Sequence, residues 1–531
     1  MINTRTALAM LVTLALSCTL SAPASATPHV LTFADGTDLT GLNPLRPEAA
    51  PNYELNYLTM GYLARYGEHG IAPELLAALP TARNGGISAD GKTIVFKLRR
   101  GLKWSDGAPL TAADVAFSVA TIQDPNANSQ YLSTFADVTS VDTPDDVTAV
   151  FHLSRPHGQA LEDFFSSRSA PLLPKHLLTG VPINSAPYLQ LPIGAGPFRY
   201  TKWVRGDRVE LERNPYYALG TPKLERIVYK MIPTITGTVT ALRTGEVDIA
   251  LSSTYPDYKP IENDPSIKLI TMPGVRPSNF VLNVTRGALG DVNVRRALRL
   301  GTDRASILAR SYLGAGVLSE SRINAGDPFV AHIPLVRYDP AAANALLDRA
   351  GWKRGPDGMR AKNGQPLALE LVGGAGSTFV DQILELTRAD WTALGIAVTT
   401  KRYQLSLMFA PAEQGGILFG GKFDIALFST GEQTAADGAG PECKDIPPHG
   451  TNFGRLCDRA FDALIDRANT IYDPAVAGPL YREIQQRQFD LTAYIVLALR
   501  NELWLNRANV SGAKLYPFAF FYDPLTLDVE N

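Results

Sequence analysis

Cys443 and Cys457 are the residues whose type and spacing most directly predict chemistry. A stretch rich in proline and glycine separates them, and a third cysteine, Cys18, lies near the N-terminus. Once the N-terminal segment is removed, an even pair this close predicts one disulfide in an oxidising compartment. Closing a loop of about 15 residues would stabilise the fold by roughly 3 kcal/mol. A metal centre needs more ligands than the nearby His449 supplies, so the spacing favours a disulfide.

Catalytic signatures are missing from the sequence. There is no G-x-S-x-G elbow, H-E-x-x-H helix, C-x-x-C pair or phosphate-binding loop. Ser511 to Lys514 fits S-x-x-K, but no K-T-G partner follows, so we attribute the match to chance. The seven histidines include no i,i+4 pair. We therefore predict no enzymatic activity, no cofactor and no metal, and a periplasmic hydrolase is the disfavoured alternative.

Length and composition indicate an ordinary globular protein of more than one domain. The chain has 531 residues, of which 45% are hydrophobic and 19% charged, with a net charge of −2. A single hydrophobic core seldom serves so long a chain, so we expect two or three domains. Lysines and arginines are scattered singly, which excludes an evident nucleic-acid surface.

The N-terminus has the features of a signal peptide. Arg5 provides a positive charge, Ala7 to Leu20 is apolar but too short to span a bilayer, and Ala24 to Ala26 forms an A-x-A cleavage site. We predict cleavage after Ala26 and a location in the periplasm. Lipid attachment at Cys18 is an alternative, because the preceding residues loosely resemble a lipoprotein cleavage box.

The segment from Ala89 to Ser118 predicts a strand, a loop and a capped helix. Ile94, Phe96 and Leu98 alternate with polar or smaller neighbours, as a half-buried strand requires. Thr111 and Asp114 have the spacing of a capping box at the start of the helix. Later in the chain, Asp291 and Asp339-Pro340 begin further helices, Gly395 ends another, and strands alternate with these helices. This alternation indicates an α/β fold with a mostly parallel sheet.

Gly91 to Val115 resembles, almost residue for residue, the signature of the extracytoplasmic solute-binding proteins of ABC importers, in the dipeptide/oligopeptide/nickel-binding family (family 5). Further motifs follow in the family's order, namely Pro192 to Phe198, Asn214 to Tyr217, Leu242 to Asp248, and Phe280 to Leu298. The resemblance implies a type II periplasmic-binding-protein fold, with two α/β lobes of mixed sheets joined by two hinge strands, and an extra subdomain on lobe I.

On that template the division of the chain can be written out. After the signal peptide (1–26), lobe I comprises 27–58, 188–274 and 506–531, the extra subdomain 59–187, and lobe II 275–505. The hinge crossings are expected near Val275 and Leu505.

The resemblance also implies where a ligand binds. Family members place the first contacts on the loop after the opening strand, where Tyr53 and Tyr57 stand at i,i+4 and could offer two aromatic faces. An equally good interpretation makes them core residues of a helix. Asn279 and Phe280, at the first hinge, are further candidates.

Peptide anchors of the family are altered in this chain. Phe423 to Gly431 resembles the family's F-D-[LI]-A-L-x-x-W, but Ser429 and Thr430 replace the tryptophan. Asp437 or Glu432 could supply the acid that, in the family, pairs with a peptide's α-ammonium. A solvated loop acid is the alternative. Dipeptide binders carry an arginine for the peptide's carboxylate near the start of the helix before Trp391, where this chain has Asp381 and Gln382.

We therefore expect a monomeric, non-catalytic receptor that captures a peptide or peptide-like solute and delivers it to the permease subunits of an ABC transporter. The altered anchors fit a neutral or cationic solute, such as an oligosaccharide, opine or amine, better than they fit a zwitterionic peptide, and a nickel chelate is a further alternative. A chaperone-like binder is a third possibility.

Overall fold

The computed structural model describes residues 29–35, 39, 41–47, 50–232, 234–251, 255–429, 434–435, 442–448, 450–516 and 519–530. The predicted signal peptide, with Ala26 and Cys18, lies outside these residues. Among the helices that fall within them, none is both long enough and apolar enough to cross a bilayer.

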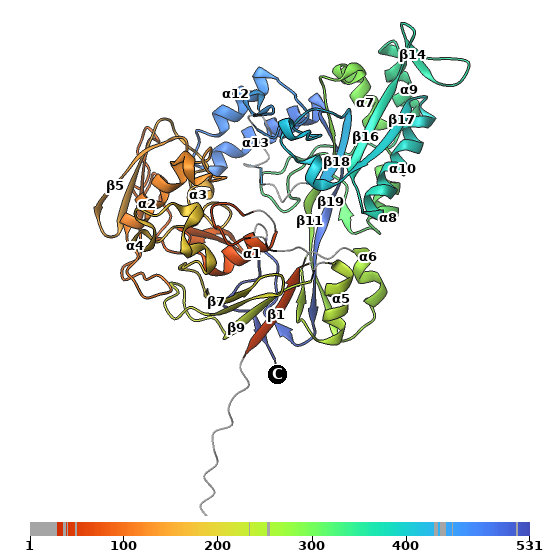
Figure 1. Ribbon diagram of the computed structural model, residues 1–531. Helices are drawn as coiled ribbons and strands as arrows, with labels where there is room; N and C mark the ends of the chain where they lie inside the picture. The colour runs from red at the N-terminus through yellow and green to blue at the C-terminus, as the bar shows by residue number, and fades with distance from the viewer. Residues whose placement is uncertain are drawn as a thin grey trace, which may run out of the picture.

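One sheet of 11 strands runs through both halves of the molecule, in the order β17-β16-β18-β11-β19-β10-β1-β9-β8-β7, with β12 paired to β19. Its two longest members, β11 (Ile267–Leu282) and β19 (Tyr494–Arg507), are antiparallel neighbours that pass from one lobe to the other (Figure 1). The expected two-lobed α/β fold with two hinge strands is thereby confirmed.

Lobe I lies at the foot of the molecule in Figure 1 and contains both ends of the described chain. Its core packs aromatic side chains from β1 and β9 against Trp504 and Phe521 near the C-terminus. Its elements are β1 (Val30–Asp35), α1 (Ala50–Thr59), β7 (Phe198–Val204), β8 (Arg208–Arg213), β9 (Arg226–Met231), α5 (Ile235–Thr244), β10 (Ile249–Ala250), α6 (Tyr255–Tyr258), β20 (Val510–Ser511) and β21 (Asp528–Val529).

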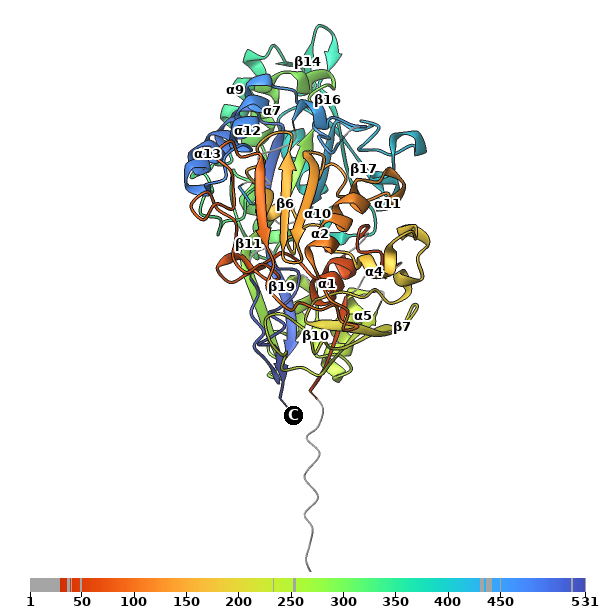
Figure 2. The same cartoon turned by 90° about the vertical axis from the view of Figure 1, so that its left-hand side faces the viewer.

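The extra subdomain has a hydrophobic core of its own, centred on Trp104 and Phe151. Its three-stranded sheet faces the viewer in Figure 2. The predicted capping box is present, since the Asp114 carboxylate accepts the N–H of Thr111 at 2.8 Å. Its elements are β2 (Ala64–Gly67), β3 (Gly70–Pro73), β4 (Thr93–Lys97), α2 (Ala112–Gln123), β5 (Val138–Asp145), β6 (Thr148–Leu153), α3 (Ala160–Asp163) and α4 (Lys175–Leu178).

Lobe II packs α7, α8 and α10 around Trp391, with a buried ion pair between Arg304 and Glu320 beside them. As predicted, the side chains of Asp291 and Asp339 cap α7 and α9. The elements are α7 (Val292–Leu300), α8 (Arg304–Ser311), β12 (Gly316–Val317), α9 (Pro340–Arg349), β13 (Lys353–Arg354), β14 (Arg360–Lys362), β15 (Gln365–Pro366), β16 (Ala368–Gly374), α10 (Thr378–Ala393), β17 (Ala397–Tyr403), α11 (Leu405–Met408), β18 (Ile425–Ser429), α12 (Arg459–Ala468) and α13 (Pro474–Leu491).

The parallel strands of each lobe end on the side that faces the other lobe. β16, β17 and β18 are mutually parallel, and so are β10, β1 and β9, whereas β11 is antiparallel to β18 and β19 is antiparallel to β10. Because β11 runs from lobe I to lobe II and β19 runs back, the carboxyl ends of the parallel strands in each lobe point toward the other lobe. Ligands of α/β sheets bind at such carboxyl ends, so the interlobe region is the expected place for a site.

Pairing between the hinge strands is interrupted twice, between Met272 and Arg276 and between Ser278 and Asn279. At the first interruption, Gly274 adopts a left-handed conformation (φ +67°) that favours glycine. The Asn501 side chain accepts the N–H of Gly274 at 3.1 Å and so replaces a strand-to-strand bond. The interruptions are β-bulges, which locally bend a strand pair.

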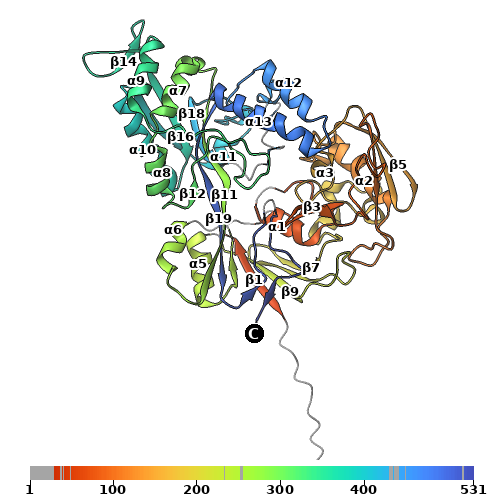
Figure 3. The ribbon, with the colours of Figure 1, turned by 180° about the vertical axis from the view of Figure 1, so that it is seen from behind.

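The extra subdomain also touches lobe II directly. The hydroxyl of Tyr472, between α12 and α13, donates to the carbonyl of Gly91 at 2.7 Å and accepts the N–H of His157 at 3.1 Å. Gly158 donates its N–H to the Asn469 carbonyl at 2.6 Å. We call these bonds the subdomain–lobe II contact; α3 and α13 approach each other there in Figure 3.

Candidate ligand-binding site

A pocket of about 990 Å³ lies where the lobes meet at the hinge. Lobe I contributes the first turn of α5 and the start of α6, and lobe II contributes the end of α8 and the β16–α10 turn. Strand β19 supplies Arg500, Asn501 and Leu503. Figure 3 shows α5 and α6 facing α8 across this region. The volume lies at the upper end of the range for small-molecule sites.

Aromatic and basic side chains dominate the lining of the pocket. Tyr255 comes from lobe I, while Tyr312 and Phe379 form an edge-to-face pair from lobe II with ring centroids 4.8 Å apart. The guanidinium of Arg500 lies 5.9 Å from the centroid of the Phe379 ring. Arg310 is the second arginine, and no aspartate or glutamate stands among the described residues that line the pocket.

Burial shifts the pKa values of two residues that line the pocket, Tyr312 and Arg500. Desolvation is the main cause that raises the pKa of Tyr312 to about 12, so its hydroxyl keeps its proton. Desolvation also lowers the pKa of Arg500 from its ordinary value, because the charged guanidinium loses water there. Such shifts mark a polar group held in a mostly apolar surrounding.

A second charged cluster lies on the hinge beside the pocket. Glu502, two residues after Arg500, pairs with Arg276 and accepts the indole N–H of Trp504 at 3.0 Å. Glu54 of α1 is buried nearby, and its pKa is raised well above the usual value, first by burial and then by the charges of Asp35 and Glu502. The cluster joins lobe I to the hinge strands and occupies both carboxylate oxygens of Glu502.

The structure keeps the two predicted tyrosines apart from the interlobe pocket. Tyr57 is buried in lobe I, where its ring packs 4.3 Å from the guanidinium of Arg65. Tyr53 is partly buried, with its ring 5.1 Å from that of Phe520, and its hydroxyl accepts a hydrogen bond from Gln130 at 3.3 Å. Both sit on α1, as the helical spacing predicts.

Asn279 and Phe280 are fully buried on β11. Phe280 packs against Trp391 with ring centroids 5.6 Å apart, within the core of lobe II. Neither the side-chain oxygen nor the nitrogen of Asn279 has a hydrogen-bond partner among the described residues. The side chain of Asn279 is therefore a buried amide on hinge strand β11 whose hydrogen-bonding groups are unsatisfied among the described residues.

The remaining candidates lie at the ends of lobe II strands and helices. Asp381 bonds Arg402 at 2.7 Å, and Gln382 rather than Asp381 lines the pocket. Ser429 ends β18 and is exposed, paired in register with Ser278. Thr430, Glu432 and Asp437 lie outside the described residues.

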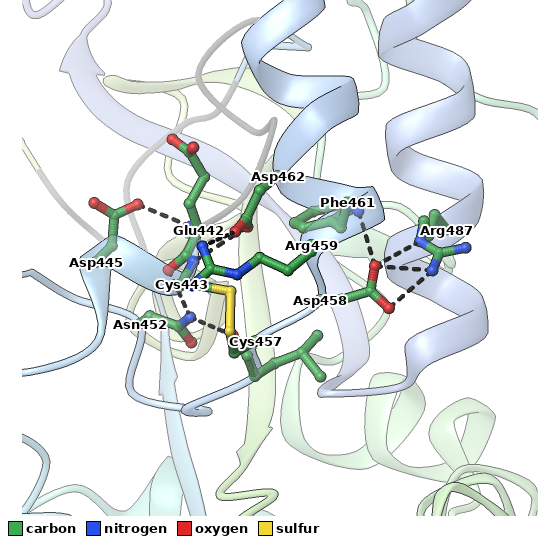
Figure 4. The surroundings of a disulfide bond; sticks show 11 residues. Glu442, Cys443, Asp445, Asn452, Cys457, Asp458, Arg459, Phe461, Asp462 and Arg487 are labelled. Carbon is green, nitrogen blue, oxygen red and sulfur yellow. Dashed lines mark hydrogen bonds and ion pairs between the residues drawn. A yellow bond between two sulfur atoms is a disulfide. The ribbon is translucent and has the colours of Figure 1, made fainter.

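The predicted disulfide is present between Cys443 and Cys457 (Figure 4). It ties the loop before α12 to Cys457, which directly precedes Asp458, the N-cap residue of that helix. Asp458 in turn bonds Arg487 of α13 at 2.8 Å. Asn452 donates to the carbonyls of Glu442 and Leu456, across the closed loop. Within the described ranges no group of three His, Cys, Asp or Glu side chains is arranged to hold a metal ion.

Arg500, Tyr312 and Phe379 did not emerge from the sequence as candidates. A signal for Arg500 was available: with Asn501 and Glu502 it interrupts the otherwise apolar run from Ile495 to Leu505. A charged residue within a buried strand is rare unless it is paired or functional.

Comparison with known proteins gives a consistent result. The model of the bacterial extracellular solute-binding proteins, family 5 middle region, matches residues 73–441. Di/tripeptide-binding protein 2 of Pseudomonas aeruginosa (strain UCBPP-PA14) is 26% identical over 517 residues, which cover 89% of this chain and 92% of that protein.

Two solved structures share the fold. Oligopeptide-binding protein AppA of Bacillus subtilis (strain 168) is 26% identical over 448 residues, covering 83% of this chain and 80% of that protein. The structure of AppA with a nonapeptide matches with a TM-score of 0.78 at 23% identity, over 95% of this chain and 100% of that one. NikA from Brucella suis in complex with Fe(III)-EDTA matches with a TM-score of 0.83 at 22% identity, over 94% and 100%. With more than half of its length matched by the family model, the chain belongs to the bacterial extracellular solute-binding proteins of family 5.

Proposed function

We propose that this protein captures a peptide or peptide-like solute in the pocket between its lobes and delivers it to the permease subunits of an ABC importer. The family is one of solute-binding receptors rather than enzymes, which agrees with the missing catalytic signatures. The observation that carries the proposal is the 990 Å³ pocket, lined from both lobes and from hinge strand β19. A ligand that touches both lobes stabilises the closed arrangement through its differential affinity.

Peptides are the first choice because the relatives are named for them. Di/tripeptide-binding protein 2 and oligopeptide-binding protein AppA both align with most of this chain. Tyr53, Tyr57, Asn279, Phe280, Asp381, Ser429, Thr430 and Asp437 remain our proposed candidates for contacts in an open or ligand-bound arrangement, alongside the pocket residues.

A non-peptide solute is the second candidate. The sequence favoured a neutral or cationic solute, because the arginine of dipeptide binders is missing near Asp381. The pocket contains Arg500 and Arg310 without a described acidic lining residue, which favours an anionic solute instead. NikA, whose fold is shared, was solved with the chelate Fe(III)-EDTA.

We further propose that the protein matures by cleavage after Ala26 and acts in the periplasm as a monomer, with lipid attachment at Cys18 as the alternative. The predicted division into lobe I (27–58, 188–274 and 506–531), extra subdomain (59–187) and lobe II (275–505) is the working description of the moving parts. The cleavage site is tested by N-terminal sequencing of the exported protein.

Thermal-shift screening tests the function directly. A true ligand present at 100 times its Kd should stabilise the protein by about 2.7 kcal/mol. Di- and tripeptides, opines, oligosaccharides and metal chelates form the panel, and small-angle scattering should show a smaller radius of gyration for the bound protein. A shift with an opine or sugar and none with any peptide would refute the peptide assignment. Suppression of aggregation of unfolded proteins, without a shift for any solute, would favour the chaperone.

A further inference from the structure

Arg500 carries a positive charge in the interlobe pocket and has no ion-pair partner among the described residues. Its Nε is buried without a hydrogen-bond partner, and its side chain forms no ion pair there. Glu502 is the acid whose charge favours the charged form of Arg500, but its carboxylate oxygens are bonded to Arg276 and Trp504, and the charge of Arg276 acts in the opposite direction. A desolvated cation without a counter-charge is costly, and proteins retain one where a ligand supplies the opposite charge.

The first turn of α10 adds a second source of positive potential, because the acid in that turn, Asp381, is paired with Arg402 at 2.7 Å. Ser377 caps this helix of 16 residues, and Gly376 to Phe379 line the same pocket as Arg500. The first backbone N–H groups of a helix have no partner within the helix, and its dipole favours an anion at that end. Gly376 has a left-handed backbone, and apart from its chain neighbours no atom lies within 4 Å of the position that a Cβ would take, so a ligand can approach the turn closely.

A buried hydroxyl completes the set. Ser311 at the end of α8 is 3% exposed, lines the pocket, and its Oγ has no hydrogen-bond partner among the described residues. The hydroxyl of Tyr312, beside it, is held in its protonated form and can donate. A buried hydroxyl without a hydrogen-bond partner destabilises the protein, and an acceptor on a bound ligand would remove that destabilisation.

The described lobe I residues that line the pocket include no acid that could pair with Arg500. Tyr255 and Pro256 offer apolar surface, and Thr236 lies in the first turn of α5, a second helix whose N-terminal end faces the pocket. Positive potential therefore converges from both lobes and from the hinge.

We propose that the interlobe pocket holds a carboxylate of the bound solute between the guanidinium of Arg500 and the first turn of α10, with the Ser311 hydroxyl as a further donor. This inference rests on the proposed function, because it assigns the ligand class to the same pocket. A peptide would present its C-terminal carboxylate there.

Paired ligands test the charge. Trialanine and trialaninamide differ only in the C-terminal group, and their Kd values are measured by calorimetry at constant ionic strength. We expect the free acid to bind about 10- to 100-fold more tightly, as a charge-assisted hydrogen bond implies. Arg500→Gln should remove this preference, and Arg500→Lys should retain part of it because the charge remains.

The matched control is Arg482→Gln. Arg482 of α13 also lies 5.9 Å from a phenylalanine ring centroid, that of Phe329, but does not line the pocket. Its replacement should leave the preference unchanged. Because Arg500 is desolvated, forms no ion pair and has an unbonded Nε among the described residues, Arg500→Gln should leave the melting temperature of the ligand-free protein unchanged or raise it.

A second arm separates this inference from the peptide assignment. Succinate and succinamide are compared for their effect on the melting temperature of wild-type protein, Arg500→Gln and Arg482→Gln. If neither tripeptide binds but succinate stabilises only the proteins that retain Arg500, the peptide function fails and the carboxylate site stands. If the acid and amide peptides bind equally well with and without Arg500, the peptide function stands and the carboxylate site is overturned. No Arg500-dependent effect of any carboxylate also overturns it.

Discussion

Replacing Tyr472 with phenylalanine tests whether the subdomain–lobe II contact holds the two bodies together. The change deletes the hydroxyl that joins the Gly91 carbonyl and the His157 N–H, at 2.7 and 3.1 Å. At about 0.5–1.5 kcal/mol net for each bond, the contact loses about 1–3 kcal/mol. The population of the separated form relative to the joined form should therefore rise by about 5- to 150-fold.

Hydrogen exchange of the Gly158 amide measures this change. That amide donates to the Asn469 carbonyl, a bond that the substitution itself leaves intact, so its protection reports opening of the contact. We expect protection of Gly158 to fall by the same factor, with no loss in the lobe cores. Tyr338→Phe is the control, since Tyr338 is exposed in lobe II and distant in sequence from the contact.

Gly158→Ala approaches the same contact by sterics. An added methyl group at Gly158 would lie 2.4 Å from the carbonyl oxygen of Ile471, so the two backbones must separate. Gly67→Ala, in the same subdomain, meets nothing within 4 Å and is the matched control. Unchanged exchange and unchanged scattering in both Tyr472→Phe and Gly158→Ala would refute the reasoning that this contact restrains opening.

Three further predictions concern stability. Replacing Cys443 and Cys457 together by serine should lower the free energy of unfolding in urea by roughly 3 kcal/mol, as expected for their separation of 14 residues; equal stability with and without reductant would contradict this. Glu320→Gln leaves a buried arginine without its charge partner and should cost about 3–5 kcal/mol, whereas Glu385→Gln on the surface should cost at most about 1 kcal/mol; similar urea midpoints would argue against this difference. Burial alone would lower the pKa of His157, but its carboxylate neighbours Asp163 and Asp137 outweigh burial and raise the pKa above 6.5. The contribution of His157 to the free energy of unfolding is therefore full below pH 6.5 and declines as the pH rises through the folded-state pKa. A stability difference between wild type and His157→Gln that is the same at every pH would rule this out.

Local sequence signals predicted the elements well. Alternation at Ile94 and Phe96, and the cap formed by Thr111 and Asp114, appear in the structure as β4 and the start of α2. Such signals act within a few residues, and packing in the subdomain core agrees with them. The disulfide followed from counting cysteines, because only two remain once the predicted signal peptide is removed.

The lining of the pocket could not be predicted from these local signals. Thr236, Ser311, Gly376 and Arg500 are each separated by more than 60 residues, and only the strand order of the shared sheet brings them together. The orientation of single side chains was equally hidden. Neighbours on a helix point about 100° apart, so Gln382 lines the pocket while the adjacent acid bonds Arg402 of β17.

The bulges in the β11–β19 ladder determine where a bend between the lobes can occur. Between Met272 and Arg276, three residues of β11 stand opposite Asn501 alone, so backbone hydrogen bonds are already missing there. A rotation of the lobes can be absorbed in this short unpaired segment, while the ladders on either side keep their bonds. Arg500 immediately precedes Asn501 and pairs in register with Arg276, so it lies at the edge of this unpaired segment. A solute anchored there stays close to the axis of rotation, so the lobes can swing while its charged end hardly moves.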